Sequence, residues 1–284
     1  MTSSSIRVDY HFHPNFPFWI PLVGRFLSKR KAQSIWKAFS RHNVHLIFVS
    51  EHVYKRPRRA FEFLLKHRPE GSETHLVPSI EYLTSEGVDI IVFAERPENV
   101  YCHRDLLIPW KLSVDQVVKM IIYNENLYGI VVHPCTPGTT SILRGCGKEV
   151  TLQAIRDLGF LEVHNCSSAA LQELMDVLKV SKLLRNKYQQ VVETKHAPDY
   201  LKLGGVVFTG GSDAHQAWEI GDCMEIESEY RNNQPHLFNI ATSQSGVPSE
   251  RDRHYKRTLL LSSITVLHEW ILKKTRLYTV DKPL

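Results

Sequence analysis

Histidines and carboxylates gather at the ends of short apolar runs in this sequence. The first run ends in His11-Phe12-His13, and later runs end in Val131-Val132-His133-Pro134 and Gly211-Ser212-Asp213-Ala214-His215. Because side chains alternate along a strand, an HxH pair places both imidazoles on one side, where they can bind one ion. Imidazole with carboxylate suits Zn, Mn or Fe, whereas an all-thiolate site needs cysteine clusters that this chain lacks. The pattern therefore predicts a metal centre.

The same kind of residue follows other apolar runs, in Ser50-Glu51-His52, in Pro78-Ser79-Ile80-Glu81 and in Glu162-Val163-His164-Asn165. A single histidine after an apolar run usually has a packing or surface role. Unpartnered polar groups at so many strand ends would carry a desolvation cost, so their recurrence favours a shared function. The candidate ligands are six histidines and two carboxylates: His11, His13, His52, Glu81, His133, His164, Asp213 and His215.

These residues need strands and helices to position them, and short β-like runs alternate with helical stretches. The expected strands are Ile6–Tyr10, Val44–Val49, Leu76–Leu83, Val88–Ala94, Gly129–His133, Phe160–Asn165 and Val206–Gly210. The expected helices are Lys31–Arg41, Arg56–His67, Val114–Glu125, Thr151–Leu158, Ala169–Leu184 and Ala197–Lys202, with Ser113 as an N-cap. Such alternation predicts parallel strands with crossover helices, in a barrel or a doubly wound sheet, with the C-terminal strand ends converging on one face.

The chain changes character after about residue 230. The polar segment Arg231–Arg253 indicates a linker or long loop, and an apolar-striped helix is expected over His254–Lys274. We therefore expect a catalytic domain over residues 1–230 and an appendage over residues 231–284 that packs on it.

Composition narrows the class of protein. A hydrophobic content of 43% with 23% charged residues is typical of a globular chain, and the net charge of +5 allows attraction for phosphorylated or nucleic-acid ligands without requiring it. Five cysteines without a CxxC pair favour a reducing compartment. The amino terminus lacks a signal-peptide layout, and the apolar segment Phe16–Leu27 is too short and too interrupted to span a bilayer. A cytoplasmic protein is expected, with this segment as a loop over the core or a lid.

The ordered motifs resemble the PHP family, named for polymerase and histidinol phosphatase. The match runs from HxH through Ser50-Glu51-His52, Glu81, HP and His164-Asn165 to GSDxH, over roughly residues 5–225. The resemblance implies a distorted seven-stranded β/α (TIM-like) barrel that binds two or three divalent ions, Zn, Mn or Fe. It assigns one ion to His11, His13, Glu81 and Asp213, and a second to Glu81, His133 and His164. The third falls to His52 and His215.

One departure concerns the third ion. Family members often supply another His or Asp soon after the HxH pair, whereas this chain continues Pro14-Asn15-Phe16. The third site is therefore weaker, recruits Asn15 or Glu51, or is empty. Glu51 also stands where aspartate is usual.

The leading hypothesis is hydrolysis of a small phosphate ester by a metal-activated hydroxide. Asp213 or His215 would shuttle a proton, and Arg144, in an expected loop over Thr136–Lys148, is a candidate phosphate clamp. A nuclease acting on short or single-stranded nucleic acid is the close alternative. A non-catalytic, metal-stabilised interaction module and an amidohydrolase are the others. The substrate and the oligomeric state are not determined by the sequence.

Overall fold

The computed structural model describes residues 4–20, 22–134, 140–167, 203–221, 223–228, 237–249, 271–272, 275 and 280–284. The expected helices Ala169–Leu184 and Ala197–Lys202 lie outside the described residues, and so does nearly all of the expected C-terminal helix His254–Lys274.

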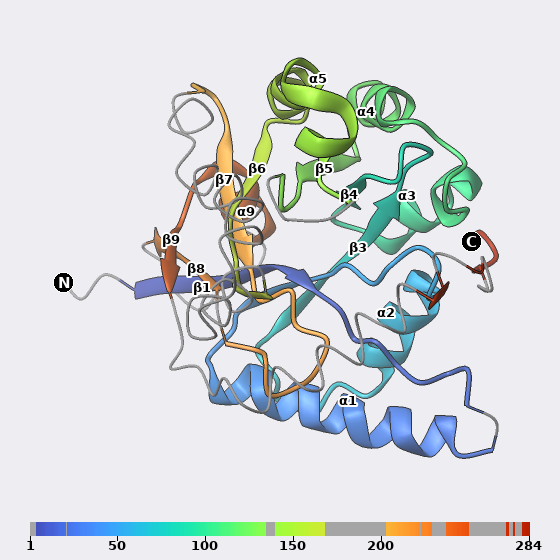
Figure 1. Ribbon diagram of the computed structural model, residues 1–284. Coiled ribbons are helices and arrows are strands. Elements are labelled where there is room, and N and C mark those ends of the chain that lie inside the picture. The colour runs from blue at the N-terminus through green and yellow to red at the C-terminus, as the bar shows by residue number, and fades with distance from the viewer. Residues whose placement is uncertain are drawn as a thin grey trace, which may run out of the picture.

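One sheet organises the described part of the chain (Figure 1). Its strands are β1 (Ser4–Phe12), β2 (Leu46–Val49), β3 (His75–Leu83), β4 (Asp89–Phe93), β5 (Tyr128–Val131), β6 (Phe160–Asn165), β7 (Val207–Gly211), β8 (Cys223–Ser228) and β9 (Val247–Ser249), in the order 7-6-5-4-3-2-1-8-9. A parallel bridge between Phe12 and Ala214 brings the chain after β7 back to the end of β1. The sheet is therefore nearly closed, and the expected barrel-like α/β fold is confirmed.

The expected count of seven strands is wrong, because the described sheet has nine. β8 pairs antiparallel with the far edge of β1, and β9 pairs antiparallel with β8. The uniformly parallel arrangement is also wrong, since β4 runs antiparallel to both β3 and β5. Only residues 84–88 separate β3 from β4. A parallel crossover needs about a dozen residues or more, so this connection can only form a hairpin.

The helices are α1 (Gly24–Arg41), α2 (Pro57–Lys66), α3 (Pro97–Tyr101), α4 (Val114–Ile122), α5 (Ile142–Leu158) and α9 (Leu237–Ser243). Figure 1 places α1 at one end of the molecule and α4 with α5 at the other. The predicted cap of α4 is confirmed, since the Ser113 hydroxyl accepts from the Gln116 N–H at 3.2 Å and the Gln116 side chain accepts from the Ser113 N–H at 2.9 Å.

Two helices begin earlier than predicted. α1 starts at Gly24 rather than Lys31, so the last four residues of the expected Phe16–Leu27 loop are helical. α5 starts at Ile142, which puts Arg144 on a helix and not in a loop. Two glycines obscured that helix: they lower helix propensity, and Gly147 bends the chain with a φ of 83°.

The sheet separates two groups of apolar side chains. Ile6, Val8 and Tyr10 of β1 pack with Leu237 and Ala241 of α9, and the Tyr10 hydroxyl donates to the Ala241 carbonyl at 2.9 Å. Phe12, although two residues beyond Tyr10, belongs to the other cluster, with the buried side of α1. A register shift between Asp9 and Phe12 causes this change of face. α9 and β9 lie within the expected linker Arg231–Arg253.

Candidate metal centre

Four predicted ligands converge where β1 ends. The Nε2 atoms of His11 and His13 lie 3.0 Å apart. Asp213 Oδ1 is 3.2 Å from His13 Nε2 and 3.6 Å from His11 Nε2, and Glu81 Oε1 is 3.4 Å from His11 Nε2. Atoms that bind one ion at 2.0–2.2 Å are separated by about 3.0–3.6 Å from each other, so the set of His11, His13 and Asp213 fits a divalent ion.

His133 extends this group through Glu81. Its Nε2 lies 3.0 Å from Glu81 Oε1, so His11, Glu81 and His133 form a second group that could hold an ion. Glu81 Oε1 therefore lies near the Nε2 atoms of both His11 and His133. His133 and Asp213 both have positive φ, of 28° and 46°. This backbone region is costly for residues other than glycine, and such strain concentrates at functional sites.

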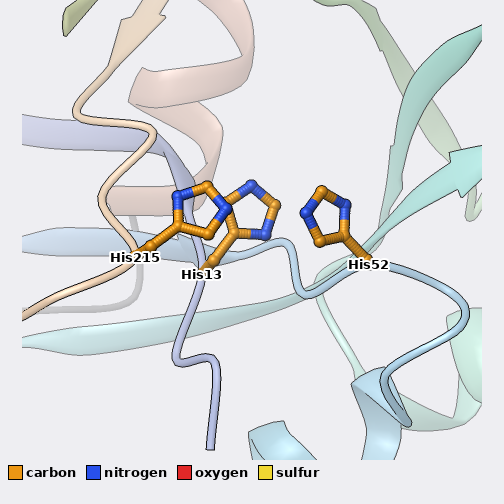
Figure 2. Close-up of side chains that lie close together, drawn as sticks. All are labelled: His13, His52 and His215. Atoms are coloured by element: carbon orange, nitrogen blue, oxygen red, sulfur yellow. The ribbon is translucent and has the colours of Figure 1, made fainter. Parts of the chain in front are cut away.

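A third group consists of His13, His52 and His215 (Figure 2). The His13 ring stacks on both neighbours, with ring centroids 4.3 Å from His52 and 4.5 Å from His215. His52 Nδ1 also contacts Glu81 Oε2. The sequence assigned only His52 and His215 to the third ion. The structure adds His13, which also belongs to the group of His11 and Asp213.

The structure does not bring His164 into any of the three groups formed by described residues. The β6–β7 register shifts between Glu162 and His164, so the strand changes face at this point. Asn165 points to the site, since its Nδ2 donates to Asp213 Oδ2 at 3.2 Å and to Glu162 Oε2 at 3.3 Å. The role of His164 as a ligand stays a prediction.

Glu162 is the residue of this site that the sequence interpretation missed. Its Oε1 lies 2.9 Å from His11 Nδ1, and its Oε2 accepts from the His133 N–H at 2.6 Å. A carboxylate on Nδ1 fixes the imidazole with Nε2 facing the ion, an arrangement common around metal-bound histidines. The available signal was a glutamate buried two residues before a strand-end histidine.

Asp9 fastens the GSDxH segment to β1. Its Oδ1 accepts from the N–H groups of His11, at 3.1 Å, and Ser212, at 3.0 Å, and its Oδ2 accepts from the Ser212 hydroxyl at 2.6 Å. Complete burial raises the pKa of Asp9 to about 7. A Cβ on Gly211 would lie 2.5 Å from the His11 nitrogen, so only glycine allows this approach.

Asn15 and Glu51, considered as extra ligands, make contacts that position the loops, and their role as ligands stays a prediction. Glu51 Oε2 accepts from the Asn15 N–H at 2.5 Å, and its Oε1 accepts from the His52 N–H at 3.2 Å. Lys55 donates to Asn15 Oδ1 at 3.0 Å. Lys31 donates to the carbonyls of Asn15, at 3.0 Å, and His215, at 2.7 Å. Two lysine side chains therefore contact the loops that bear His13 and His215.

The charge of the site calls for a cation. Burial alone would lower the pKa of His11, but the carboxylates of Asp213 and Glu162 outweigh it and raise that pKa well above its usual value. Burial would raise the pKa of Asp213, but His11 and the other histidines hold it well below the usual range. Buried carboxylates are costly unless a positive partner neutralises them, which a divalent ion would do.

Arg144 is exposed on α5, and its side chain makes no hydrogen bond or ion pair to these groups within the described residues. Its role as a phosphate clamp stays a prediction. Among all the residues that the structure describes, no helix is both long enough and apolar enough to cross a membrane.

Comparison with known proteins identifies a solved structure that has a similar fold. No family model and no curated protein matches this chain. PsfC from Pseudomonas syringae PB-5123 is 17% identical with a TM-score of 0.54, covering 93% of this chain and 99% of that one. This chain shares its fold with PsfC. Endonuclease Q, solved with a 27-mer duplex containing an abasic lesion, is 13% identical with a TM-score of 0.47, covering 80% of this chain and 54% of that one. The PHP resemblance itself rests on the motifs.

Proposed function

We propose that this chain is a metal-dependent phosphoesterase of the PHP type, which hydrolyses a phosphate ester. The observation that carries the proposal is the convergence of His11, His13 and Asp213 within the ligand spacing of one divalent ion, with Glu81 Oε1 3.4 Å from His11 Nε2. Bridging by Glu81 to His133 provides for a second ion nearby. Bound divalent ions would neutralise phosphoryl oxygens and lower the pKa of a bound water near neutrality.

The surrounding residues hold the ligands in a fixed geometry. Glu162 orients His11 through Nδ1, and Asp9 keeps the segment that bears Asp213 against β1. Fixed ligands reduce the reorganisation needed when charge develops on the phosphoryl group.

His215 is the better candidate for proton transfer to the leaving group. Asp213 faces both histidines of the HxH pair, and its low pKa keeps it charged at neutral pH, so it serves as a ligand and not as an acid. His215 Nδ1 lies 3.0 Å from the Asp213 carbonyl, which orients the ring. The His215 N–H donates to Glu219 at 2.8 Å, which steadies the loop.

The test is phosphate release from a panel of monoesters and diesters by protein loaded with Mn²⁺ or Zn²⁺, with labelled oligonucleotides in parallel. We expect release with added metal and none in a His13→Ala variant. Ordered shortening of oligonucleotides would assign the nuclease alternative. Metal-loaded protein that is inactive on every ester would contradict the proposal.

A further inference from the structure

An apolar tip projects between β1 and α1. The exposed side chains of this tip are Trp19 (69%), Leu22 (102%), Val23 (51%), Phe26 (61%) and Leu27 (39%). Figure 1 shows the connection from β1 running out beyond the end of α1 before the helix begins. Large apolar side chains that are exposed singly are ordinary, but these five fall within nine residues of the sequence, and a group of this kind marks a binding surface.

The tip is held by a packed base. Phe16 and Phe18, at the root of the loop, pack on Phe63 of α2, with ring centroids 5.0 and 5.3 Å away. The Arg59 guanidinium lies over the Phe18 ring at 4.3 Å. The Gly24 N–H donates to the Ile20 carbonyl at 3.1 Å and continues the turn into α1. The loop therefore buries Phe16 and partly buries Phe18, while it presents the next apolar residues to solvent.

The outer face of α1 continues this surface with positive charge. Its exposed basic residues are Arg25, Lys29, Arg30, Lys37 and Arg41. No Asp or Glu occurs in the sequence between Asp9 and Glu51, and none of the five basic side chains has an acidic partner within 4.0 Å among the described residues. The opposite face of the helix, including Ile35 and Phe39, is buried against the sheet.

We propose that this surface docks the protein on a lipid bilayer with anionic headgroups. Aromatic and aliphatic side chains beside a row of Lys and Arg match the interfacial boundary, where apolar groups enter the acyl region and cations face the headgroups. A nucleic acid would satisfy the basic row, but it offers no apolar environment to Leu22, Val23 or Leu27. Docking is peripheral and independent of the proposed hydrolysis.

The experiment is co-sedimentation of the full chain with vesicles of phosphatidylcholine alone or with added phosphatidylserine. We expect binding to the anionic vesicles, weakened by salt, and little binding to the neutral ones. The variant Arg25→Gln/Lys29→Gln/Arg30→Gln should bind on the order of 100-fold more weakly, at about fivefold per charge. Leu22→Ser/Phe26→Ser should also lose binding.

Matched controls lie elsewhere on the surface. Ile122→Ser/Tyr123→Ser removes two exposed apolar groups at the end of α4, and Lys66→Gln/Arg104→Gln/Arg156→Gln removes three exposed charges. Both controls should bind like the wild type. All the substituted side chains are exposed, so unchanged thermal melting is expected throughout. Absence of vesicle binding, equal binding to neutral vesicles, or binding of a labelled oligonucleotide in its place would overturn the proposal.

Discussion

Replacement of Glu162 tests whether the buried histidines are metal ligands, without removing a ligand. Its carboxylate lies 2.9 Å from His11 Nδ1 and 2.6 Å from the backbone nitrogen of His133, so it supports two separate ligands. Loss of an outer-shell partner of this kind lowers metal affinity by about 10–100-fold, or about 1.4–2.7 kcal/mol. Glu162→Gln keeps an acceptor for His11, so its loss of metal affinity should be near the lower value. The loss in Glu162→Ala should reach or exceed the upper value.

The assay is competition for Zn²⁺ or Mn²⁺ against a chromogenic chelator, with the exposed Glu98→Gln on α3 as the control. Melting of the metal-free proteins separates a change in affinity from a loss of fold. Metal affinity of Glu162→Ala within twofold of the wild type, in a folded protein, would refute the assignment of His11 as a ligand oriented through Nδ1.

Three further predictions concern the supports of the site. Gly211→Ala places a Cβ 2.5 Å from the His11 nitrogen, so we expect at least tenfold weaker metal binding, measured by the same competition. Asp9 has a pKa raised from 3.8 to about 7, so its contribution to stability is full below about pH 4 and is lost as the pH rises to about 7. The free energy of unfolding of Asp9→Asn relative to the wild type, measured in urea with a chelator present, should therefore be roughly 2.5 kcal/mol higher at pH 8 than at pH 5. The same relative free energy at both pH values would contradict this prediction. Lys31→Met removes the ammonium that donates to the carbonyls of Asn15 and His215, and urea unfolding should show a free energy of unfolding that is lower by about 2–4 kcal/mol.

The sequence predicted the strand and helix elements well where periodicity was strong. The strand Phe160–Asn165 and the Ser113 cap of α4 were located correctly, because a bounded apolar run and a capping box are local signals. The strands β8 and β9 were missed. β8 pairs with β1, more than 200 residues away in the sequence, and β9 pairs in turn with β8, so no local pattern encodes these contacts.

The site, too, was predicted where the signal is local and missed where it depends on neighbouring strands. Motif order identified residues that the structure brings together, including the HxH pair and Asp213. The sequence could not reveal that β6 shifts register after Glu162, or that Asn165 donates to Asp213 at the site. A one-residue bulge reverses which side chains face inward, and its position is set by the neighbouring strand.

The central claim is that His11, His13, Glu81 and Asp213 hold a divalent ion. The direct measurement is elemental analysis of the full chain purified without chelator, beside His11→Ala/His13→Ala and the control His67→Gln. We predict one or more divalent ions per chain in the wild type and the control, and a marked loss of bound metal in the folded double variant. A folded wild type without metal that binds none when it is added, or a metal content that the double variant leaves unchanged, would contradict the account.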